Sequence, residues 1–547
     1  MNDEPTLLVA QEVLSCYISS IPPEVLSKIL ILCHDTWEDG CLWQPAHSGH
    51  NIPIYLTQIC SSWRLLALDT PELWSFVKLT FTEQSARNTG AITEFADRWL
   101  TKGRRGKLAL HIRMGFSFDD ENRTDTAPIG QLLDARASDL QKFALAECPE
   151  NVTDYVIARM AKNSFPSLEE VELHAYSSIW RTRFDALVAA PRLHTVRFQT
   201  WRSPPAHHDL TLLHLPWAQL RSFSISSSVS EHECLSILSH CPELTNLKVS
   251  VTSAMEFPSS AVILPKLSRL QLVPSVDDWG PSRTDIGRFL DVLRLPALHD
   301  LELYFIVYDP WNPLVSRFWD RHSAQLRAFD LSNLYFRADL HLLFRTMPDL
   351  TSLTLSPREI RLAAPDFDAL RVERLLPALT HLDVTVGYAP GIVALDSIRS
   401  AITLVEARAA ESAENGVARL QRVKLADWTA WDAVERDLPR VDPVTMDMEL
   451  NRLRELKAHG MHVQWQGPQG QRYDMLVPPD ECWFPQIPPD DDEPRYSSMA
   501  TSSRPNSDAG IGELKVKRRR TLFTLLRFFG GSCRLRGNRQ SSARSRM

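Results

Sequence analysis

A short pattern recurs along the middle of the 547-residue chain and constrains its fold more than any other feature. It is a proline, a leucine two residues later and, after two further residues, two apolar residues separated by one other. Clear copies are FPSLEEVEL (165–173), APRLHTVRF (190–198), CPELTNLKV (241–249), LPKLSRLQL (264–272), LPALHDLEL (295–303), MPDLTSLTL (347–355) and LPALTHLDV (376–384). With weaker copies added, the first leucines fall at 140, 168, 193, 220, 244, 267, 298, 326, 350, 379, 420 and 453. Most steps are 23 to 31 residues, which indicates a stack of similar structural units.

The spacing predicts the structure of each unit. The last two apolar residues alternate, so on a β-strand their side chains share one face and the residue between them points to the other. Stretches between copies, such as SEHECLSILSHC (230–241) and TDIGRFLDVLRL (284–295), open with a possible helix cap and carry apolar residues three and four apart. The proline lies at the strand start, where its missing N–H removes no ladder bond. Because one such unit cannot bury its apolar face alone, we expect a curved α/β solenoid with parallel strands on its concave side.

The pattern resembles the leucine-rich repeats, in a degenerate form. The period agrees, but no regular asparagine follows the strand. Chance recurrence in a leucine-rich chain is the alternative, and so many copies in near register argue against it. We expect the array over 107–483, with a first strand at 107–114 and a connector at 81–106 that contains a helix at 91–100. Repeat boundaries after 390 stay open, and the weakest copy is Leu453-Leu456-Ala458.

The residues between the last two apolar positions are candidates for binding a partner on the concave face. A strand face of mixed charge is often only a solvated surface, and that alternative stays open. The candidates are Glu172, Arg197, Ser224, Lys248, Gln271, Glu302, Asp330, Thr354, Asp383 and Lys424.

Two helical patterns precede the array. In SSIPPEVLSKILILCH, Ser20 is a possible cap, and Pro22 and Pro23 lie in a first turn where proline costs no intrahelical hydrogen bond. A second helix is expected from Leu56 to Ala67, ending before the Thr70-Pro71 dipeptide. Two helices cannot hide this much apolar surface between them, so something else must cover part of it.

These two segments resemble an F-box. The resemblance rests on IPPEVLSKIL (21–30) and LTQICSSWRLLALDTPELW (56–74), the latter with a T-P-x-L-W tail common in fungal members. Ile21 replaces the usual leucine, and the insert at 35–55 is longer than the shortest family loops. We assign residues 20–80 to this module and 1–19 to an N-terminal extension.

The resemblance implies a partner and a role. An F-box docks on the Skp-type adaptor of a cullin-based ubiquitin ligase, and a repeat array behind it selects the protein substrate. Each residue that the family motif assigns to adaptor binding could equally be internal core. These residues are Pro22, Pro23, Leu26, Ile29, Leu30, Ile59, Cys60, Trp63 and Leu66.

No motif of an enzyme or metal site is present. The sequence lacks GxxxxGK[ST], GxGxxG, GxSxG and HExxH. Cys33, Cys41, His47 and His50 match no zinc-finger spacing. The nine cysteines include no CxxC pair, which fits reduced thiols. No apolar run approaches the ~20 residues that a membrane-spanning helix needs. We expect a protein without catalytic activity, metal or cofactor. We also expect it to lie in the cytoplasm or the nucleus.

The carboxyl-terminal segment, residues 484–547, is expected to be a disordered linker and a basic tail. Residues 515–547 hold eleven Lys or Arg and no acid, which leaves 49 basic and 67 acidic residues in the remaining chain. KVKRRR (515–520) is typical of a nuclear-localisation patch, and with TLFTLLRFF (521–529) it could also lie on an anionic membrane surface; a plain disordered tail is the third alternative. The acidity of the rest argues against nucleic-acid binding by the fold.

Two function hypotheses from different classes follow. The first is a non-catalytic F-box adaptor that recruits a protein substrate. The second is a repeat scaffold without a ligase role, whose amino-terminal helices only cap the solenoid. An enzyme has no supporting residue.

Overall fold

The computed structural model divides the chain into two compact units, one of residues 1–43 with 483–547 and one of residues 44–482. The residues it describes are 21–40, 52–82, 88–103, 107–114, 125–174, 184–199, 210–252, 261–273, 287–304, 313–332, 340–356, 364–386, 391–410, 416–427, 443–466 and 472–473. In the first unit these form helix α2 (Pro23–Gly40). The expected extension at 1–19, the disordered linker and the basic tail lie outside the described residues, as do Ser20, His47 and His50.

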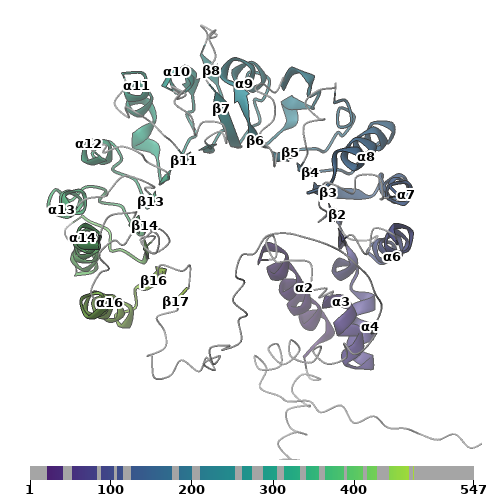
Figure 1. Cartoon of the computed structure of the whole chain (residues 1–547), viewed down its shortest axis with the longest axis horizontal. Helices are drawn as coiled ribbons and strands as arrows, with labels where there is room; N and C mark the ends of the chain where they lie inside the picture. Colours follow the sequence, from purple (N-terminus) through teal and green to yellow (C-terminus); the bar gives the residue numbers. More distant parts are fainter. Residues whose placement is uncertain are drawn as a thin grey trace, which may run out of the picture. The chain divides into compact units, whose positions relative to one another are not determined.

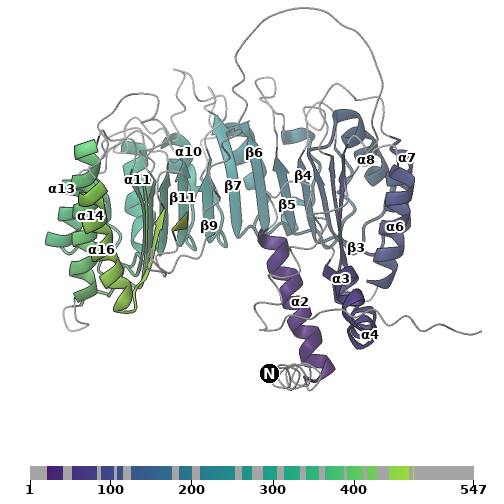
Figure 2. The same cartoon turned by 60° about the horizontal axis from the view of Figure 1, so that its bottom comes forward.

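The second unit is built on one 15-stranded sheet, which confirms the predicted α/β solenoid. Neighbouring strands are parallel, except that the last pairs antiparallel with its neighbour. Figure 1 shows the strands along the inner side of an arc, and Figure 2 shows them side by side. In sheet order they are β1 (Phe76–Phe81), β2 (Leu108–Met114), β3 (Leu140–Ala146), β4 (Glu170–His174), β5 (Thr195–Gln199), β6 (Ser222–Ser230), β7 (Asn246–Thr252), β9 (Arg269–Leu272), β11 (Asp300–Tyr304), β12 (Ala328–Ser332), β13 (Ser352–Ser356), β14 (His381–Val386), β15 (Arg422–Asp427), β16 (His462–Gln466) and β17 (Arg472–Tyr473).

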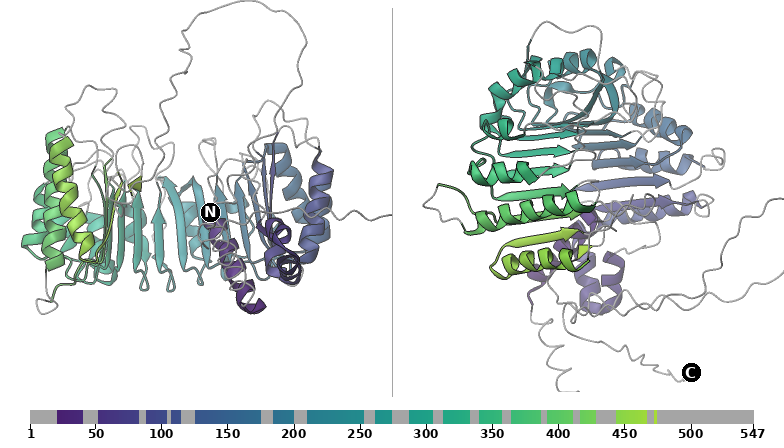
Figure 3. Two further views of the ribbon diagram at one scale, coloured as in Figure 1. Left: turned by 90° about the horizontal axis from the view of Figure 1, so that it is seen from below. Right: turned by 60° about the vertical axis from the view of Figure 1, so that its left-hand side comes forward.

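Helices cover the convex side of this sheet (Figures 1 and 3). Ser230 caps α9 as expected, since its side chain accepts a hydrogen bond from the backbone N–H of Glu233. A short parallel pair, β8 (Val262–Ile263) with β10 (Leu293–Arg294), forms a second small sheet. The helices are α6 (Thr89–Lys102), α7 (Ala127–Arg136), α8 (Glu150–Lys162), α9 (Glu231–Leu238), α10 (Gly287–Val292), α11 (Pro313–His322), α12 (Leu340–Phe344), α13 (Ala364–Val372), α14 (Gly391–Ala410) and α16 (Pro443–Ala458).

The core lies between the sheet and these helices. The two apolar positions of the pattern fall in register on neighbouring strands, so that Val171 faces Val196 and Leu173 faces Phe198. Between β6 and β7 only the first of them does, because the register shifts after Ser224. All four side chains are buried, as are the first leucines of the pattern from Leu140 to Leu420. Continuous apolar rows therefore run across the repeats, as the alternation predicted.

Side-chain hydroxyls join neighbouring repeats where the strands begin. The Thr245 Oγ1 donates to the carbonyl of Arg221 at 2.9 Å, and the Thr351 Oγ1 donates to that of Arg327 at 2.9 Å. Ser268 bonds in the same way to the carbonyl of Thr245. These bonds connect neighbouring repeats although the regular asparagine is absent, and the recurring Pro-x-Leu-[Ser/Thr] could have indicated them.

Three sequence expectations about the array need correction. The sheet begins at β1, not at 107, so the connector helix α6 belongs to the helical layer of the array. Leu453 lies in α16, and the last parallel strand is β16 further on. Helix α10 ends at Val292, where Leu293 and Arg294 form β10 instead of continuing the helix. In the last two cases helical and strand spacing could not be separated over a few apolar residues.

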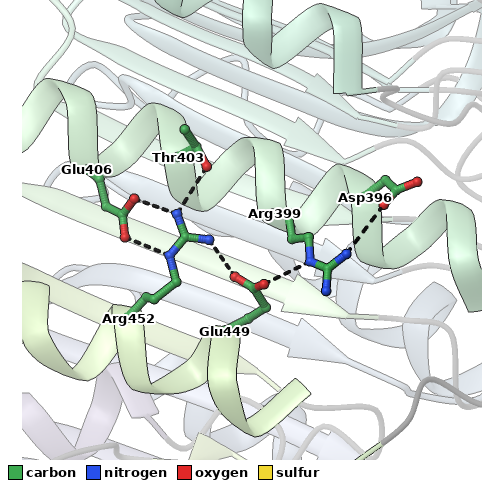
Figure 4. Close-up of polar contacts among 6 residues, drawn as sticks. All are labelled: Asp396, Arg399, Thr403, Glu406, Glu449 and Arg452. Carbon is green, nitrogen blue, oxygen red and sulfur yellow. Dashed lines mark hydrogen bonds and ion pairs between the residues drawn. The ribbon is translucent and has the colours of Figure 1, made fainter. Parts of the chain in front are cut away.

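A charged network fastens the last described helix to the array (Figure 4). Arg452 of α16 donates to Glu406 of α14 at 2.8 Å and to Glu449 at 2.6 Å. Glu449 is buried and also accepts from Arg399 at 2.9 Å. The two guanidinium groups offset the free energy that the Glu449 carboxylate loses when it is removed from water. We therefore assign this cluster a structural role.

Within the described residues, no helix combines the length and the apolar character needed to span a membrane.

Candidate interaction surfaces

The second helical pattern forms two helices, where the sequence predicted one. Helix α3 (Ile52–Ile59) ends before Cys60, whose backbone is extended (φ −155°, ψ 173°), and α4 (Ser61–Asp69) follows. The Arg64 Nε donates to the carbonyl of Thr57 at 2.7 Å and ties the two helices together. The expected continuous apolar stripe from Leu56 to Ala67 is therefore wrong, because the break changes which residues share a face.

Large apolar side chains of α3 and α4 are exposed. The exposed fractions are 47 % for Ile59, 64 % for Leu65 and 41 % for Leu68. Trp63 and Leu66, which the motif assigned to docking, are half-buried. Leu65 and Leu68 were not among the predicted docking residues, because the side of α4 that faces solvent depends on the helix break at Cys60. Exposed apolar side chains this close together in sequence make α3 and α4 a candidate surface for a partner.

The candidate residues of α2 lie in the other unit and are described on their own. Pro22 precedes the helix, and its carbonyl accepts the backbone N–H groups of Val25 and Leu26. Pro22 and Pro23 are exposed, Leu26 and Ile29 are half-buried, and Leu30 is buried. The nine predicted docking residues are thus divided between two units.

A tryptophan links α4 to the array. Helix α4 ends at Asp69, as the Thr70-Pro71 dipeptide predicted, and a 3₁₀ turn, η1 (Pro71–Trp74), leads into β1. The buried Trp74 donates its Nε1 hydrogen to the carbonyl of Ala67 at 2.6 Å, and its ring lies 4.6 Å from that of Trp99 in α6. Gly103 completes the junction, since a Cβ there would lie 2.4 Å from the Trp74 carbonyl oxygen. The T-P-x-L-W tail therefore belongs to the core.

Cys60 has an exposed thiol at the start of α4. Partial burial acts to raise its pKa. The Ser62 hydroxyl at 3.1 Å, the backbone N–H groups of Trp63 and Ser62, and the charge of Arg64 outweigh that effect and hold the pKa of the thiol below its usual value.

The ten predicted concave residues form a single row across the sheet. Each lies opposite the next in the strand register, from Glu172 opposite Arg197 to Asp383 opposite Lys424. Their side chains are half-buried or exposed except for Glu302, which is buried. The row also includes residues that were not among the candidates, Lys78, His111, Ala144 and Gln464. Ala144 lies in the weak copy that begins at Leu140, and the strands of the other three carry no copy of the pattern.

The amino-terminal part of this row is a compact ionic cluster. The Glu172 carboxylate contacts the His174 Nε2 at 2.7 Å and the Arg197 guanidinium at 3.5 Å. The hydrogen bond with His174 is the main reason why the pKa of Glu172 lies below its usual value. Burial lowers the pKa of His111 to about 4, and the Lys78 charge acts in the same direction. These groups largely neutralise one another.

The strands further along repeat this pairing with other partners. The Gln271 Nε2 donates to Glu302 at 2.8 Å, and Arg269 contacts both Glu302 and Asp300. Burial raises the pKa of Asp300, against the effect of Arg269. Between the two clusters, Lys248 stands opposite Ser224 and Gln271, without a carboxylate partner among the described residues.

No metal-binding group is found where the structure describes the chain: no three His, Cys, Asp or Glu side chains cluster suitably there. The side chains of Cys33 and Cys41 are not among those described.

Comparison with known proteins adds little. No protein-family model matches the chain, and no curated protein matches it. Among solved structures, the chain is similar to a crystal structure of the Rad7 and Elc1 complex in yeast. The identity is 11 % and the TM-score 0.29, over 78 % of this chain and 93 % of the chain matched. A likeness this low carries no functional inference, and the fold is established by the sheet itself.

Proposed function

We propose that the protein is a non-catalytic substrate adaptor of a ubiquitin ligase. In this proposal α2, α3 and α4 are the F-box that binds a Skp-type adaptor and, through it, a cullin. The concave face of the array binds the protein to be ubiquitinated. We place the protein in the cytoplasm or the nucleus, and assign the basic segment 515–547 no role beyond a possible nuclear address.

The exposed apolar residues of α3 and α4 carry the proposal. Ile59 and Leu65 lie within the F-box-like motif and are exposed, although the first leucines of the repeat pattern, from Leu140 to Leu420, are buried. An interface dominated by a few large apolar anchors needs side chains of this kind. The contacts of Trp74 with Ala67 and Trp99 support the proposal as well, because they would connect the adaptor-binding helix α4 directly to the array.

A scaffold without a ligase role is the competing function. Terminal units of a solenoid need a polar outer face that keeps the end soluble. The exposed Ile59, Leu65 and Leu68 are the opposite of such a cap. That observation is why we rank the adaptor above the scaffold.

Co-purification of the full chain with a Skp-type adaptor tests the proposal. Wild-type protein should bind, and the double variant Ile59→Ala, Leu65→Ala should bind at least tenfold more weakly, as expected for interface anchors. Both side chains are exposed, so the variant should keep its helical circular dichroism. Failure of the wild type to bind would contradict the adaptor role and favour the scaffold.

The array supplies a matched control. Ile263 on β8 is 64 % exposed, the same fraction as Leu65, but lies far along the array. Ile263→Ala should bind the adaptor as well as wild type does. Equal losses in the control and the double variant would mean that binding is non-specific apolar adhesion.

A further inference from the structure

Several cations of the concave face are already paired with carboxylates of the same face. Arg113 contacts Glu147 at 2.6 Å, and Arg269 contacts Asp300 at 3.4 Å. Each pair joins residues of the same surface, so a partner would have to displace an existing contact to use either cation.

The strands β14, β15 and β16 differ from this arrangement. Their first concave positions are His381, Arg422 and His462, which lie opposite one another in register and are all exposed. Arg422 has no carboxylate partner among the described residues. The next position holds Lys424, whose Nζ is 2.9 Å from Asp383.

The geometry of this row selects among anionic partners. Neighbouring strands are ~4.8 Å apart, so the row spans roughly 10 Å. An extended chain covers that length in about three residues at ~3.3 Å each. Side chains of parallel strands stand side by side in a line and do not converge on one point. They therefore suit a run of carboxylates better than a single phosphate, which is held by several converging donors.

We propose that the concave face of β14–β16 binds an extended, aspartate- and glutamate-rich segment of a protein. Arg422 makes the central contact, and His381 and His462 flank it. Lys424 adds a positive charge, which its ion pair with Asp383 partly neutralises. This inference rests on the proposed role of the array as the substrate-binding part, and it names the chemistry of that substrate.

Anisotropy of a fluorescein-labelled peptide of ten glutamates, titrated with the full chain, tests the site. Arg422→Gln should weaken binding about two- to fivefold, the usual size of one exposed charge pair. Asp383→Asn should strengthen it by a similar factor, because it releases Lys424. Circular dichroism and thermal unfolding of this variant should match those of wild type, so that the gain reports a local effect and not misfolding.

A matched control variant tests where the peptide binds, and a peptide with a different anion tests the preference for carboxylates. Lys248→Gln removes an unpaired cation from the same face, seven strands before β16 in the sheet, and should leave binding unchanged. Equal affinity of all the variants would overturn the proposal. A neutral peptide with one phosphoserine should bind more weakly than the glutamate peptide, and tighter binding would overturn the choice of carboxylates.

The basic segment 515–547 could capture the same peptide, so its position must be mapped. A benzophenone group on the peptide should attach to fragments of β14–β16 on irradiation. Attachment confined to 515–547 would overturn the site. The variant Ile59→Ala, Leu65→Ala should bind the peptide like wild type, so a failed adaptor experiment leaves this result interpretable.

Discussion

Helices α3 and α4 and the repeat array use similar apolar residues in opposite ways. In the array, Leu270 and its neighbours in register are enclosed between a sheet and a layer of helices. In α3 and α4, Ile59 and Leu65 have no second layer over them among the described residues and stay exposed. The difference lies in architecture more than in composition. The pattern leucines are buried because neighbouring repeats and a helical layer cover them, and Ile59 and Leu65 lack such cover among the described residues.

Truncating one leucine in each region should give the largest contrast. Leu270→Ala removes a buried side chain and should lower the free energy of unfolding by about 2 to 5 kcal/mol. Leu65→Ala removes an exposed one and should change it by about 0.5 kcal/mol or less. Thermal unfolding followed by circular dichroism measures both. A large loss for Leu65→Ala would break the comparison, because that side chain would then be part of a core.

The junction between the two regions should be nearly as sensitive. Gly103→Ala places a Cβ 2.4 Å from the Trp74 carbonyl oxygen, a backbone atom that cannot move aside cheaply. We expect a loss of up to about 3 kcal/mol, with a change in tryptophan fluorescence as Trp74 and Trp99 separate.

Gly90→Ala is the control in the same helix, α6. The nearest atom to its new Cβ is 3.9 Å away, and alanine favours a helix over glycine by roughly 0.5 to 1 kcal/mol. This variant should be neutral or slightly more stable. Equal behaviour of the two glycines would show that the junction is loose.

Acid should destabilise the array first. Burial lowers the pKa of His322 from 6.5 to about 4, so the unfolded chain takes up a proton at a pH where the folded one does not. Stability is therefore complete above about pH 6.5 and falls as the pH approaches 4, by about 2 kcal/mol for this group between pH 7.5 and 5. Residues 52–69, which form α3 and α4, contain no histidine.

Unfolding of His322→Gln by urea at both pH values measures that contribution. The variant should lose less stability than wild type on going to pH 5. If the free energy of unfolding of the variant falls between pH 7.5 and 5 by as much as that of wild type, other groups cause the acid sensitivity. His111 and Glu172 would then be the next to test.

The sequence was informative wherever a period was long and regular. Seven clear copies of one pattern predicted the strands, their parallel stacking and the row from Glu172 to Lys424. It failed where a single residue decides the outcome. Nothing about Cys60 indicates that its backbone is extended, yet that residue splits α3 from α4 and exposes Leu65. Strand β2 was predicted at 107–114 without a Pro-x-Leu motif, whereas β1, which also lacks the motif and pairs with β2, was not predicted.

The smallest effect concerns how hydroxyl groups are used in the two regions. The Thr70 Oγ1 bonds within its own turn, to the carbonyl of Leu66 at 2.7 Å, whereas the Thr245 Oγ1 reaches the preceding repeat at Arg221. Thr245→Val keeps the shape and removes that bond, at a cost of about 0.5 to 1 kcal/mol, because the Arg221 carbonyl still accepts backbone N–H groups. Thr354→Val, on the concave face, is the matched control and should be neutral.

Combining Thr245→Val with Thr351→Val should roughly double the loss, since the two sites share no partner. The melting temperatures of the single and double variants decide this. If both single variants melt like the Thr354 control, the hydroxyls are incidental, and the repeats are joined by their apolar rows and backbone bonds alone. A measurable, additive loss would instead show that hydroxyl bonds from one repeat to the next take the place of the missing asparagine in the array, whereas the Thr70 hydroxyl at the end of α4 bonds only locally, to Leu66.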